Sequence, residues 1–171
     1  MRDPGWDSFR ERLRALVARY LRDARAVDAV VAEVLVKAAD ALPVLDWPRR
    51  LETWLFQITR NRILDAFRRG EAPVLGEIDE SGDGANAESS CADPSGFLHS
   101  LRPLVESMPP PEKDILLLVD YEGATDRFLA RRLGLESSEI PARVSGARSR
   151  LRAVVLSHLE RDLDRRSASQ S

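Results

Sequence analysis

Residues 54–69 read WLFQITRNRILDAFRR, and this stretch decides the fold. Its apolar, helix-forming residues are interspersed with one Asn and a series of Arg. Aromatic rings can stack on bases and cations can hold phosphates, so such a helix suits a surface that grips opened nucleic acid. An ordinary amphipathic helix with a solvated basic face has the same composition, so the stretch by itself leaves both interpretations open.

The composition bounds the fold class. The chain has 171 residues, of which 43% are hydrophobic, so sizeable cores can form. Leu, Ala and Arg dominate and β-branched alternation is absent, which predicts an all-α protein. Cys91 is the single cysteine, which excludes an intramolecular disulfide and a cysteine-cluster zinc site and fits a reducing cytosol. We find no signal-peptide core and no membrane-length apolar run, so we expect a cytoplasmic protein without direct membrane insertion.

Charge is distributed unevenly along the chain. The net charge is −2, yet residues 71–93 carry seven acidic side chains and no basic one. The rest of the chain has 26 basic and 21 acidic residues, a charge of +5. A local basic surface can bind nucleic acid even when the overall charge hides it. The sequence therefore predicts two mildly basic parts joined by an acidic connector.

Residues 70–96 mark a domain boundary. They are rich in Gly, Ser, Asp, Glu and Ala without apolar periodicity, so they cannot bury enough surface to offset their ordering entropy. We predict helical domains at 1–69 and 97–163, an acidic flexible linker at 70–96 and a disordered tail at 164–171. A second interpretation is that the negative linker mimics nucleic acid and threads a basic groove of a partner.

The N-terminal half reads as a three-helix bundle. Apolar residues recur at helical spacing over residues 6–21 and 27–42, and a proline-bracketed loop then precedes the 54–69 helix. Three helices with short connections make a compact bundle, in which we expect Trp6 and Phe9 to be core residues.

The C-terminal half has the pattern of a helix-turn-helix. Helices are predicted over residues 115–121 and 128–133, each followed by a Gly-containing turn. Ser137 or Ser138 can cap the next helix, whose apolar stripe runs from Ile140 to Val155. This last helix is the candidate recognition helix.

Three segments resemble extracytoplasmic-function sigma factors, the small promoter-recognition subunits of bacterial RNA polymerase. Residues 54–69 are similar to the family signature aWLfrIarN…D..R. Residues 27–42, VDAVVAEVLVKAADAL, are similar without a gap to AEDLVQEVFLKAWEAL. The C-terminal half is similar to region four of the same family, with matches that include Leu133-Gly134 and Leu151-Arg152. The resemblance implies an all-α protein of two small helical domains.

The resemblance also implies a polymerase-binding face on residues 27–42, which in the family docks on a coiled coil of the largest polymerase subunit. Asp28, Glu33 and Lys37 are the candidates for this face. Ala29 and Ala32 stand where the family usually has Asp and Gln, so two polar contacts are expected to be missing. A solvated helix face would carry the same three charges.

A second implied role is promoter opening by the loop at 43–52 and the helix that follows it. In the family this loop forms a pocket for a base flipped out of the minus-ten element, and an Asn at the position of Asn61 lines the pocket. Trp47 could stack on an unpaired base or anchor the loop by partial burial. The candidates for minus-ten recognition and melting are Trp47, Arg49, Arg50, Trp54, Arg60, Asn61, Arg62, Arg68 and Arg69.

The recognition helix departs from the family. Pro141, Ala142 and Gly146 stand where relatives place base-reading residues, so little discrimination by hydrogen bonding is expected there. Arginines survive nearby, and they suit phosphate positioning better than sequence reading. The candidate DNA contacts on this helix are Arg143, Ser145, Arg148, Ser149 and Arg150.

The sequence thus predicts a sigma factor that binds core RNA polymerase and directs promoter recognition and DNA opening. By resemblance we expect an anti-sigma factor as a further partner, often membrane-bound in the family. The chain is not expected to be an enzyme or to need a cofactor or metal, because His99 and His158 look isolated. Two alternatives stay open: a sigma-like decoy that binds an anti-sigma factor without driving transcription, and a conventional helix-turn-helix repressor.

Overall fold

The computed structural model of the chain describes residues 3–44, 51–70, 97 and 99–169, and this part is built of helices. The trace starts with α1 (Pro4–Ala18), α2 (Ala24–Ala41), the short 3-10 turn η1 (Leu42–Val44) and α3 (Leu51–Arg68). It continues through α4 (Arg102–Glu106), α5 (Glu112–Leu116), the π-helical turn η3 (Leu117–Tyr121) and α6 (Asp126–Leu133). The 3-10 turn η4 (Ser137–Glu139) leads into the long helix α7 (Ile140–Ser169).

Local capping explains where the first helices begin. The side chain of Asp3 accepts hydrogen bonds from the backbone amides of Gly5, at 2.9 Å, and Trp6, at 3.4 Å, and Pro4 occupies the first turn of α1. These contacts satisfy amides that have no partner within the helix. Asp23 caps α2 in the same way.

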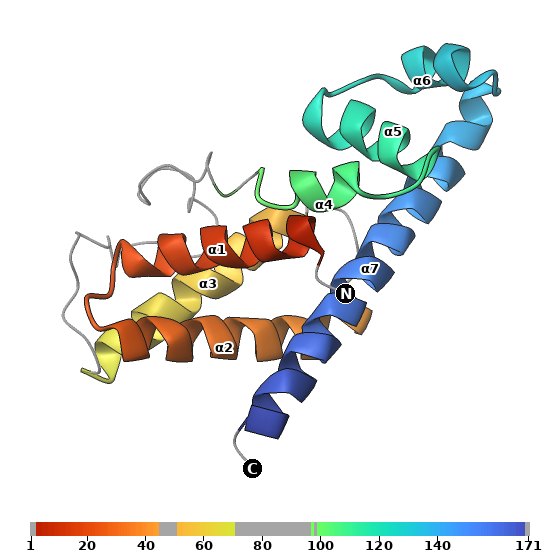
Figure 1. The fold of residues 1–171 in the computed structure, drawn as a ribbon. Helices are drawn as coiled ribbons and strands as arrows, with labels where there is room; N and C mark the ends of the chain where they lie inside the picture. The colour runs from red at the N-terminus through yellow and green to blue at the C-terminus, as the bar shows by residue number, and fades with distance from the viewer. Residues whose placement is uncertain (1–2, 45–50, 71–96, 98, 170–171) are drawn as a thin grey trace.

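The N-terminal half forms the expected three-helix bundle (Figure 1). Its apolar stripes meet in one core, and the core role predicted for Trp6 and Phe9 is confirmed, because they are 4% and 1% exposed. The helical spacing in the sequence was therefore a sound guide to which faces are buried.

The C-terminal half contains the predicted helix-turn-helix. Gly134 ends α6 with a φ of 67°, a left-handed conformation that glycine adopts without the clash of a Cβ. The sequence suggested that a serine caps α7, and this is wrong. The carboxylates of Glu136 and Glu139 instead form a reciprocal capping box around η4.

The prediction of a disordered tail at 164–171 is wrong for most of its length, because α7 is helical through Ser169. The helix continues because Leu159 and Asp162 are buried against the N-terminal half, which holds the turns on either side of them. The hydroxyls of Ser167 and Ser169 also bond back to backbone carbonyls one turn earlier.

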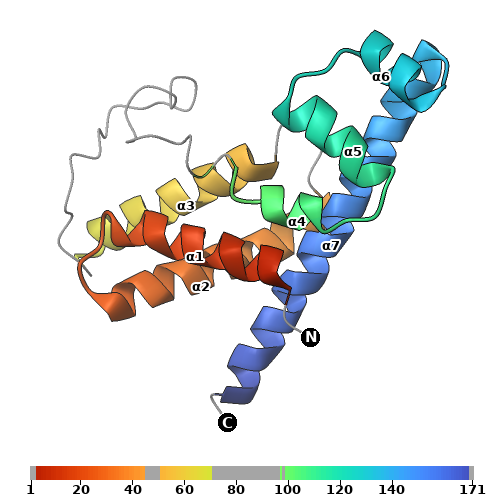
Figure 2. The same cartoon turned by 45° about the horizontal axis from the view of Figure 1, so that its top comes forward.

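The two halves lie against each other and share one continuous core. The ring of Phe97 packs against Phe9 and Phe56, with centroids 6.1 and 5.9 Å apart. Helix α4 lies along α1, and α7 crosses the end of the N-terminal bundle, as both ribbon views show (Figures 1 and 2). The start of α7 and α6 project away from that bundle. The division into separate domains joined by a linker at 70–96 stays a prediction, since residues 71–96 lie outside the described residues.

Candidate nucleic-acid interface

Helix α3 carries most of the residues predicted to open DNA. Its inner face buries Leu55, Ile63 and Ala66, which fixes the orientation of the other side chains. Asn61 and Arg68 are consequently exposed to solvent, whereas Trp54, Arg60 and Arg62 are half-buried. The exposed amide of Asn61 can donate and accept, which is what reading a base edge requires.

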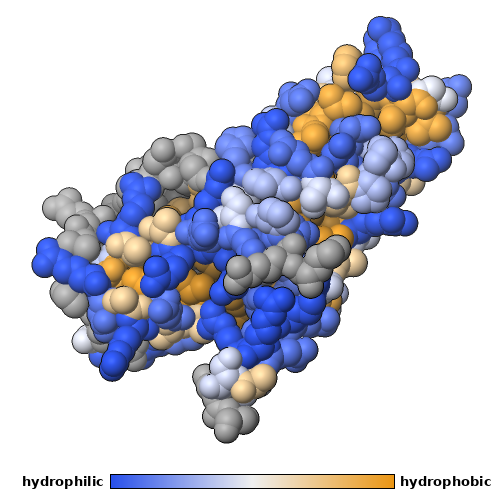
Figure 3. All heavy atoms as spheres, in the orientation of Figure 1, coloured by the Kyte–Doolittle hydropathy of each residue, from blue (hydrophilic) through white to orange (hydrophobic). Residues whose placement is uncertain are grey.

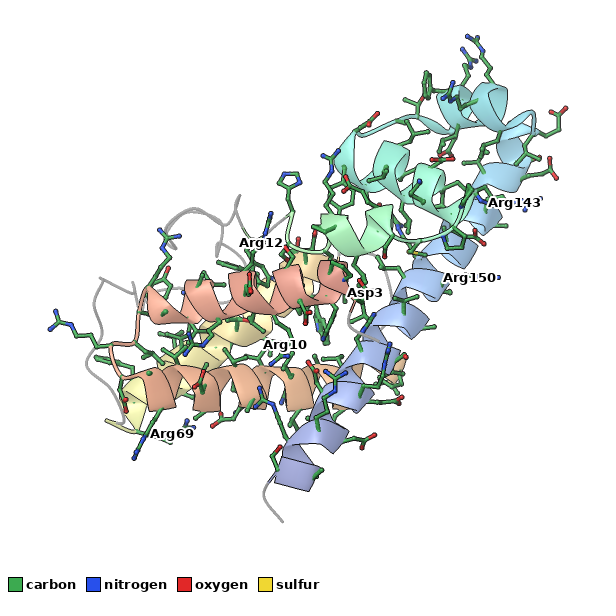
Figure 4. All side chains as sticks on the ribbon, viewed as in Figure 1. Asp3, Arg10, Arg12, Arg69, Arg143 and Arg150 are labelled. Atoms are coloured by element: carbon green, nitrogen blue, oxygen red, sulfur yellow. The ribbon has the colours of Figure 1, made fainter. Side chains whose placement is uncertain are left out.

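Arginines in and directly after α3 form ion pairs with a carboxylate of α2. Arg62 Nη1 lies 3.7 Å from Glu33 Oε2, and Arg69 Nη2 lies 3.5 Å from Glu33 Oε1. Within α3, Asp65 pairs with Arg62 at 3.8 Å and with Arg68 at 4.0 Å. These pairs are long and partly exposed, and such pairs contribute only about 0–1 kcal/mol, so an incoming phosphate can replace a carboxylate. Figure 4 labels Arg69 at the edge of this surface.

The predicted polymerase-binding residues lie on an accessible face of α2. Asp28 and Lys37 are exposed, and Val36 between the charges is 44% exposed. Asp28 pairs with Arg14 of α1 at 2.9 Å, with both side chains more than half exposed. Glu33 is the exception, because it is shared with the arginines of α3. The structure therefore joins one predicted polymerase contact to two predicted DNA contacts.

The loop residues Trp47, Arg49 and Arg50 lie outside the described residues. The two ends of the loop are firmly placed, since Leu42 is fully buried and Leu51 is 3% exposed.

Glu52, at the start of α3, was missed by the sequence analysis. It is 2% exposed, and its Oε1 accepts hydrogen bonds from the backbone amide of Leu101, at 2.9 Å, and from the hydroxyl of Tyr121, at 2.8 Å. A buried carboxylate needs such donors to offset its lost hydration. No local signal reveals these contacts, because the partners come from the other half of the chain.

The recognition helix places its candidate contacts unevenly. Arg143, Ser145 and Ser149 are exposed at the start of α7, and Figure 4 shows Arg143 and Arg150 along that helix. Arg148 instead forms a two-pronged pair with Asp120, at 2.5 and 3.4 Å, and this carboxylate is only 10% exposed. Arg150 Nε lies 3.5 Å from Glu112 Oε1.

A polar cluster joins α1 to the second half of α7. Trp6 Nε1 donates to Asp162 Oδ2 at 2.9 Å, and Arg10 Nε lies 3.2 Å from the same oxygen. His158, which looked isolated in the sequence, stacks on Trp6 with centroids 5.1 Å apart and lies 3.3 Å from Asp3 Oδ2. Burial lowers the pKa of His158, and the nearby Arg161 lowers it further, while Asp3 and Asp162 oppose the shift.

Apolar side chains also gather on the outer face of the C-terminal half, around α5 and α6 (Figure 3). Phe128 is 51% exposed, and Leu117 and Leu118 are half-buried beside the core.

The family comparison agrees with the geometry of α1–α3. Residues 6–72 match the family Sigma-70 region 2, a span that contains the face of α2 and the arginines of α3. RNA polymerase sigma factor SigZ of Bacillus subtilis is 26% identical over 92% of this chain and 89% of its own length. The ECF RNA polymerase sigma factor EcfG of Rhodopseudomonas palustris is 27% identical over 84% of this chain and 78% of its own. The chain is therefore a sigma factor that is similar over most of its length to extracytoplasmic-function members.

Solved structures of other sigma factors resemble this sigma factor only in part. RpoE in complex with the anti-sigma factor NepR from Bartonella quintana is 20% identical, covers 86% of this chain and 91% of its own, and has a TM-score of 0.34. CnrH in complex with the cytosolic domain of CnrY is 20% identical, covers 88% of this chain and 81% of its own, and has a TM-score of 0.29.

No helix in the described part of this sigma factor is long and apolar enough to cross a membrane.

Proposed function

We propose that this sigma factor docks on core RNA polymerase through the exposed face of α2 and opens promoter DNA with α3 and the loop before it. The observation that carries the proposal is that α2 and α3 pack side by side and each presents its own exposed face. Within the region two match, α2 exposes Asp28 and Lys37, and the adjoining α3 exposes Asn61 and Arg68, with the exposed Arg69 directly after it. One face can thus hold a protein while its neighbour holds opened DNA.

The chemistry of α3 suits single-stranded DNA. Arg68 and Arg69 are exposed cations that can hold phosphates, and the pairs that Glu33 and Asp65 make with them are weak enough to exchange. The Asn61 amide would then line the pocket for an unpaired base, and Trp47 would stack on it. Base stacking of this kind is worth ~1–3 kcal/mol.

The C-terminal half would add phosphate contacts at the minus-thirty-five element. Arg143, Ser145 and Ser149 are exposed and can bind directly, whereas Arg148 and Arg150 have to leave their carboxylates first. Residues 1–69 and 97–163 would therefore be the two functional units. The assignment makes the protein a non-enzymatic initiation factor that works in the cytoplasm with its polymerase.

An anti-sigma factor is the further partner that we propose. Two structurally similar sigma factors were solved as complexes with NepR and with the cytosolic domain of CnrY. The half-exposed apolar side chains around α5 and α6 are of the kind that protein partners cover.

Transcription with purified components tests the proposal. Core RNA polymerase is mixed with the chain and with fragmented genomic DNA of the source bacterium, and transcript 5′ ends are mapped. We expect start sites that appear only when the chain is present and that share an upstream sequence. Asn61→Ala should reduce these transcripts. A chain that binds the polymerase and yields no such start sites would overturn the proposal.

A sigma-like decoy is the second candidate, favoured by the engagement of Arg148 with the nearly buried Asp120. A decoy would bind an anti-sigma factor and give no start sites in the same experiment.

A further inference from the structure

The outer side of α6 carries charges and an aromatic ring that the fold itself does not use. Helix α6 lies far from the N-terminal bundle, as both ribbon views show (Figures 1 and 2). Leu129 and Ala130 are buried on its inner side. Four exposed side chains lie on its outer side: Arg127, Phe128, Arg131 and Arg132. We call these four residues the α6 face.

The spacing of the four side chains makes them one surface. Residues three and four positions apart are neighbours on a helix, so Arg131 and Arg132 lie beside Phe128, and Arg127 lies beside Arg131. The backbone amide of Phe128 donates to the side chain of Thr125 at 3.3 Å, which caps the start of the helix. The half-exposed phenyl ring, at 51%, thus stands among cations on a firmly started helix.

The arginines of the α6 face differ from others in the C-terminal half. Arg102, Arg148 and Arg150 each pair with a carboxylate of the same half. Among the residues that the structure describes, none of the three arginines of the α6 face forms an ion pair. Three cations are therefore available to the carboxylates of a partner.

Helix stability does not explain the whole α6 face. Cations near a helix C-terminus are favourable, which accounts for Arg131 and Arg132. Arg127 instead lies in the first turn, where the positive end of the helix dipole disfavours a cation, and it is four residues from the like-charged Arg131. The exposed part of the Phe128 ring also gains nothing from burial. A partner that pairs the cations and covers the ring would offset both costs.

We propose that the α6 face docks an acidic segment of a partner protein, whose carboxylates pair with the arginines and whose apolar side chain covers Phe128. Aromatic residues and Arg are enriched at protein interfaces, and complementary charge steers the encounter. Duplex DNA presents phosphates and sugars on its outside and keeps its bases stacked, so the central ring favours a protein over DNA. None of the four residues belongs to the polymerase or promoter contacts proposed above. The docking role therefore goes beyond that function and does not depend on it.

Crosslinking from position 128 identifies the docked segment. A photoreactive benzoylphenylalanine replaces Phe128 in the full chain, inside the source bacterium, and keeps an aromatic ring at that position. After irradiation, the crosslinked peptide is sequenced by mass spectrometry. Phe67 of α3, which is 44% exposed, takes the same replacement as the matched control. We expect position 128, and not position 67, to crosslink to a segment with several Asp or Glu around an apolar residue.

A synthetic peptide with the sequence of the crosslinked segment then measures the chemistry of docking. Phe128→Ala should weaken its binding to the full chain about tenfold or more, because aromatic anchors carry much of the binding energy at interfaces. Arg131→Glu should weaken it by a similar factor, and a peptide with Lys in place of the facing acidic residue should regain most of the loss. Arg25→Ala, at an exposed arginine of α2, is the matched control and should bind like the parent.

Both changes on the α6 face are at exposed positions, so helical circular dichroism should match the parent. Three crosslinking results would overturn the docking role: a basic or neutral segment, a second copy of this chain, or no crosslink beyond that of position 67. Equal peptide binding by Phe128→Ala and the parent would also overturn it.

Titration with duplex DNA tests the other occupant of the α6 face. Phe128→Ala should leave the affinity of the full chain for duplex DNA unchanged, and a tenfold loss there would replace the protein partner by a DNA contact. Transcription is not measured in any of these steps. Failure of peptide docking therefore leaves the sigma-factor function standing, and failure of transcription leaves the docking role standing.

Discussion

The arginines at the end of α3 and those at the start of α7 are both predicted to contact DNA, yet their salt bridges differ. On α3, Arg62 and Arg69 share the 39%-exposed carboxylate of Glu33 at distances of 3.5 Å or more. On α7, Arg148 is clamped by both oxygens of Asp120, which is 10% exposed. An exposed shared carboxylate gives way to a phosphate, whereas a nearly buried one makes the arginine part of the fold.

Base reading is expected from the N-terminal half, and its loss should give the largest effect. Asn61→Ala and Trp47→Ala should each lower the rate of open-complex formation about tenfold, because each removes a base contact of ~1–3 kcal/mol. Affinity for core polymerase should stay close to normal, since α2 is untouched. Permanganate reactivity of unpaired thymines measures the opening. Arg19→Ala, at an exposed site directly after α1, serves as the control, and normal opening in both variants would show that the base pocket is misassigned.

The two classes of arginine on α7 should separate by stability. Arg148→Ala should lower the free energy of unfolding by about 1–3 kcal/mol, because it leaves Asp120 without its partner in a nearly buried site. Arg143→Ala, at an exposed position, should leave stability unchanged and weaken DNA binding equally for matched and scrambled sequences. Urea unfolding and a salt titration of DNA binding by the full chain measure the two effects. Equal stability of the two variants would contradict the difference between the two classes of arginine.

Acidification should weaken the packing of α7 on α1. The pKa of His158 is lowered by burial in the folded chain, so the unfolded chain binds a proton more readily. The contribution of His158 to stability is therefore complete above its ordinary pKa of about 6.5 and is lost as the pH falls below that value toward the lowered pKa. The charged groups facing the ring are Asp3, Asp7, Arg10, Arg161, Asp162 and Arg165.

Urea unfolding, measured from pH 8 to pH 5, checks this dependence. The parent chain should lose stability on the acid side, and His158→Gln should show a flatter profile in the same window. Superimposable profiles would mean that other groups control the acid response.

The smallest effect concerns Gly146, where space on the recognition helix is open. Gly146→Arg should add one phosphate contact, because no buried carboxylate holds the new arginine. The salt dependence of log affinity should steepen by about 0.9, with a similar gain on any sequence. A gain confined to one sequence would instead indicate base reading at this position.

The local parts of this fold were accessible from sequence, and the long-range parts were not. Helical spacing and Gly134 are local signals, so the bundle and the helix-turn-helix were predictable. The pairing of Trp6 with Asp162 joins residues 156 positions apart, and no periodicity reports such a contact. The disordered tail was wrongly predicted for the same reason, because contacts with the other half of the molecule hold the end of α7. Glu52 was missed for the same reason, since its donors are distant in sequence.

The π-helical turn at Leu117–Tyr121 sets the rotational register of the C-terminal half. Each residue of an α-helix advances the chain by about 100° around the axis, so one residue more or less redirects every side chain beyond it. Here the wider turn aims two consecutive residues at different partners: Asp120 at Arg148, and Tyr121 at Glu52. One irregular turn thus couples the recognition helix to the flank of the melting loop. Deleting a single residue from it would turn both side chains away at once, while leaving the composition of either surface almost unchanged.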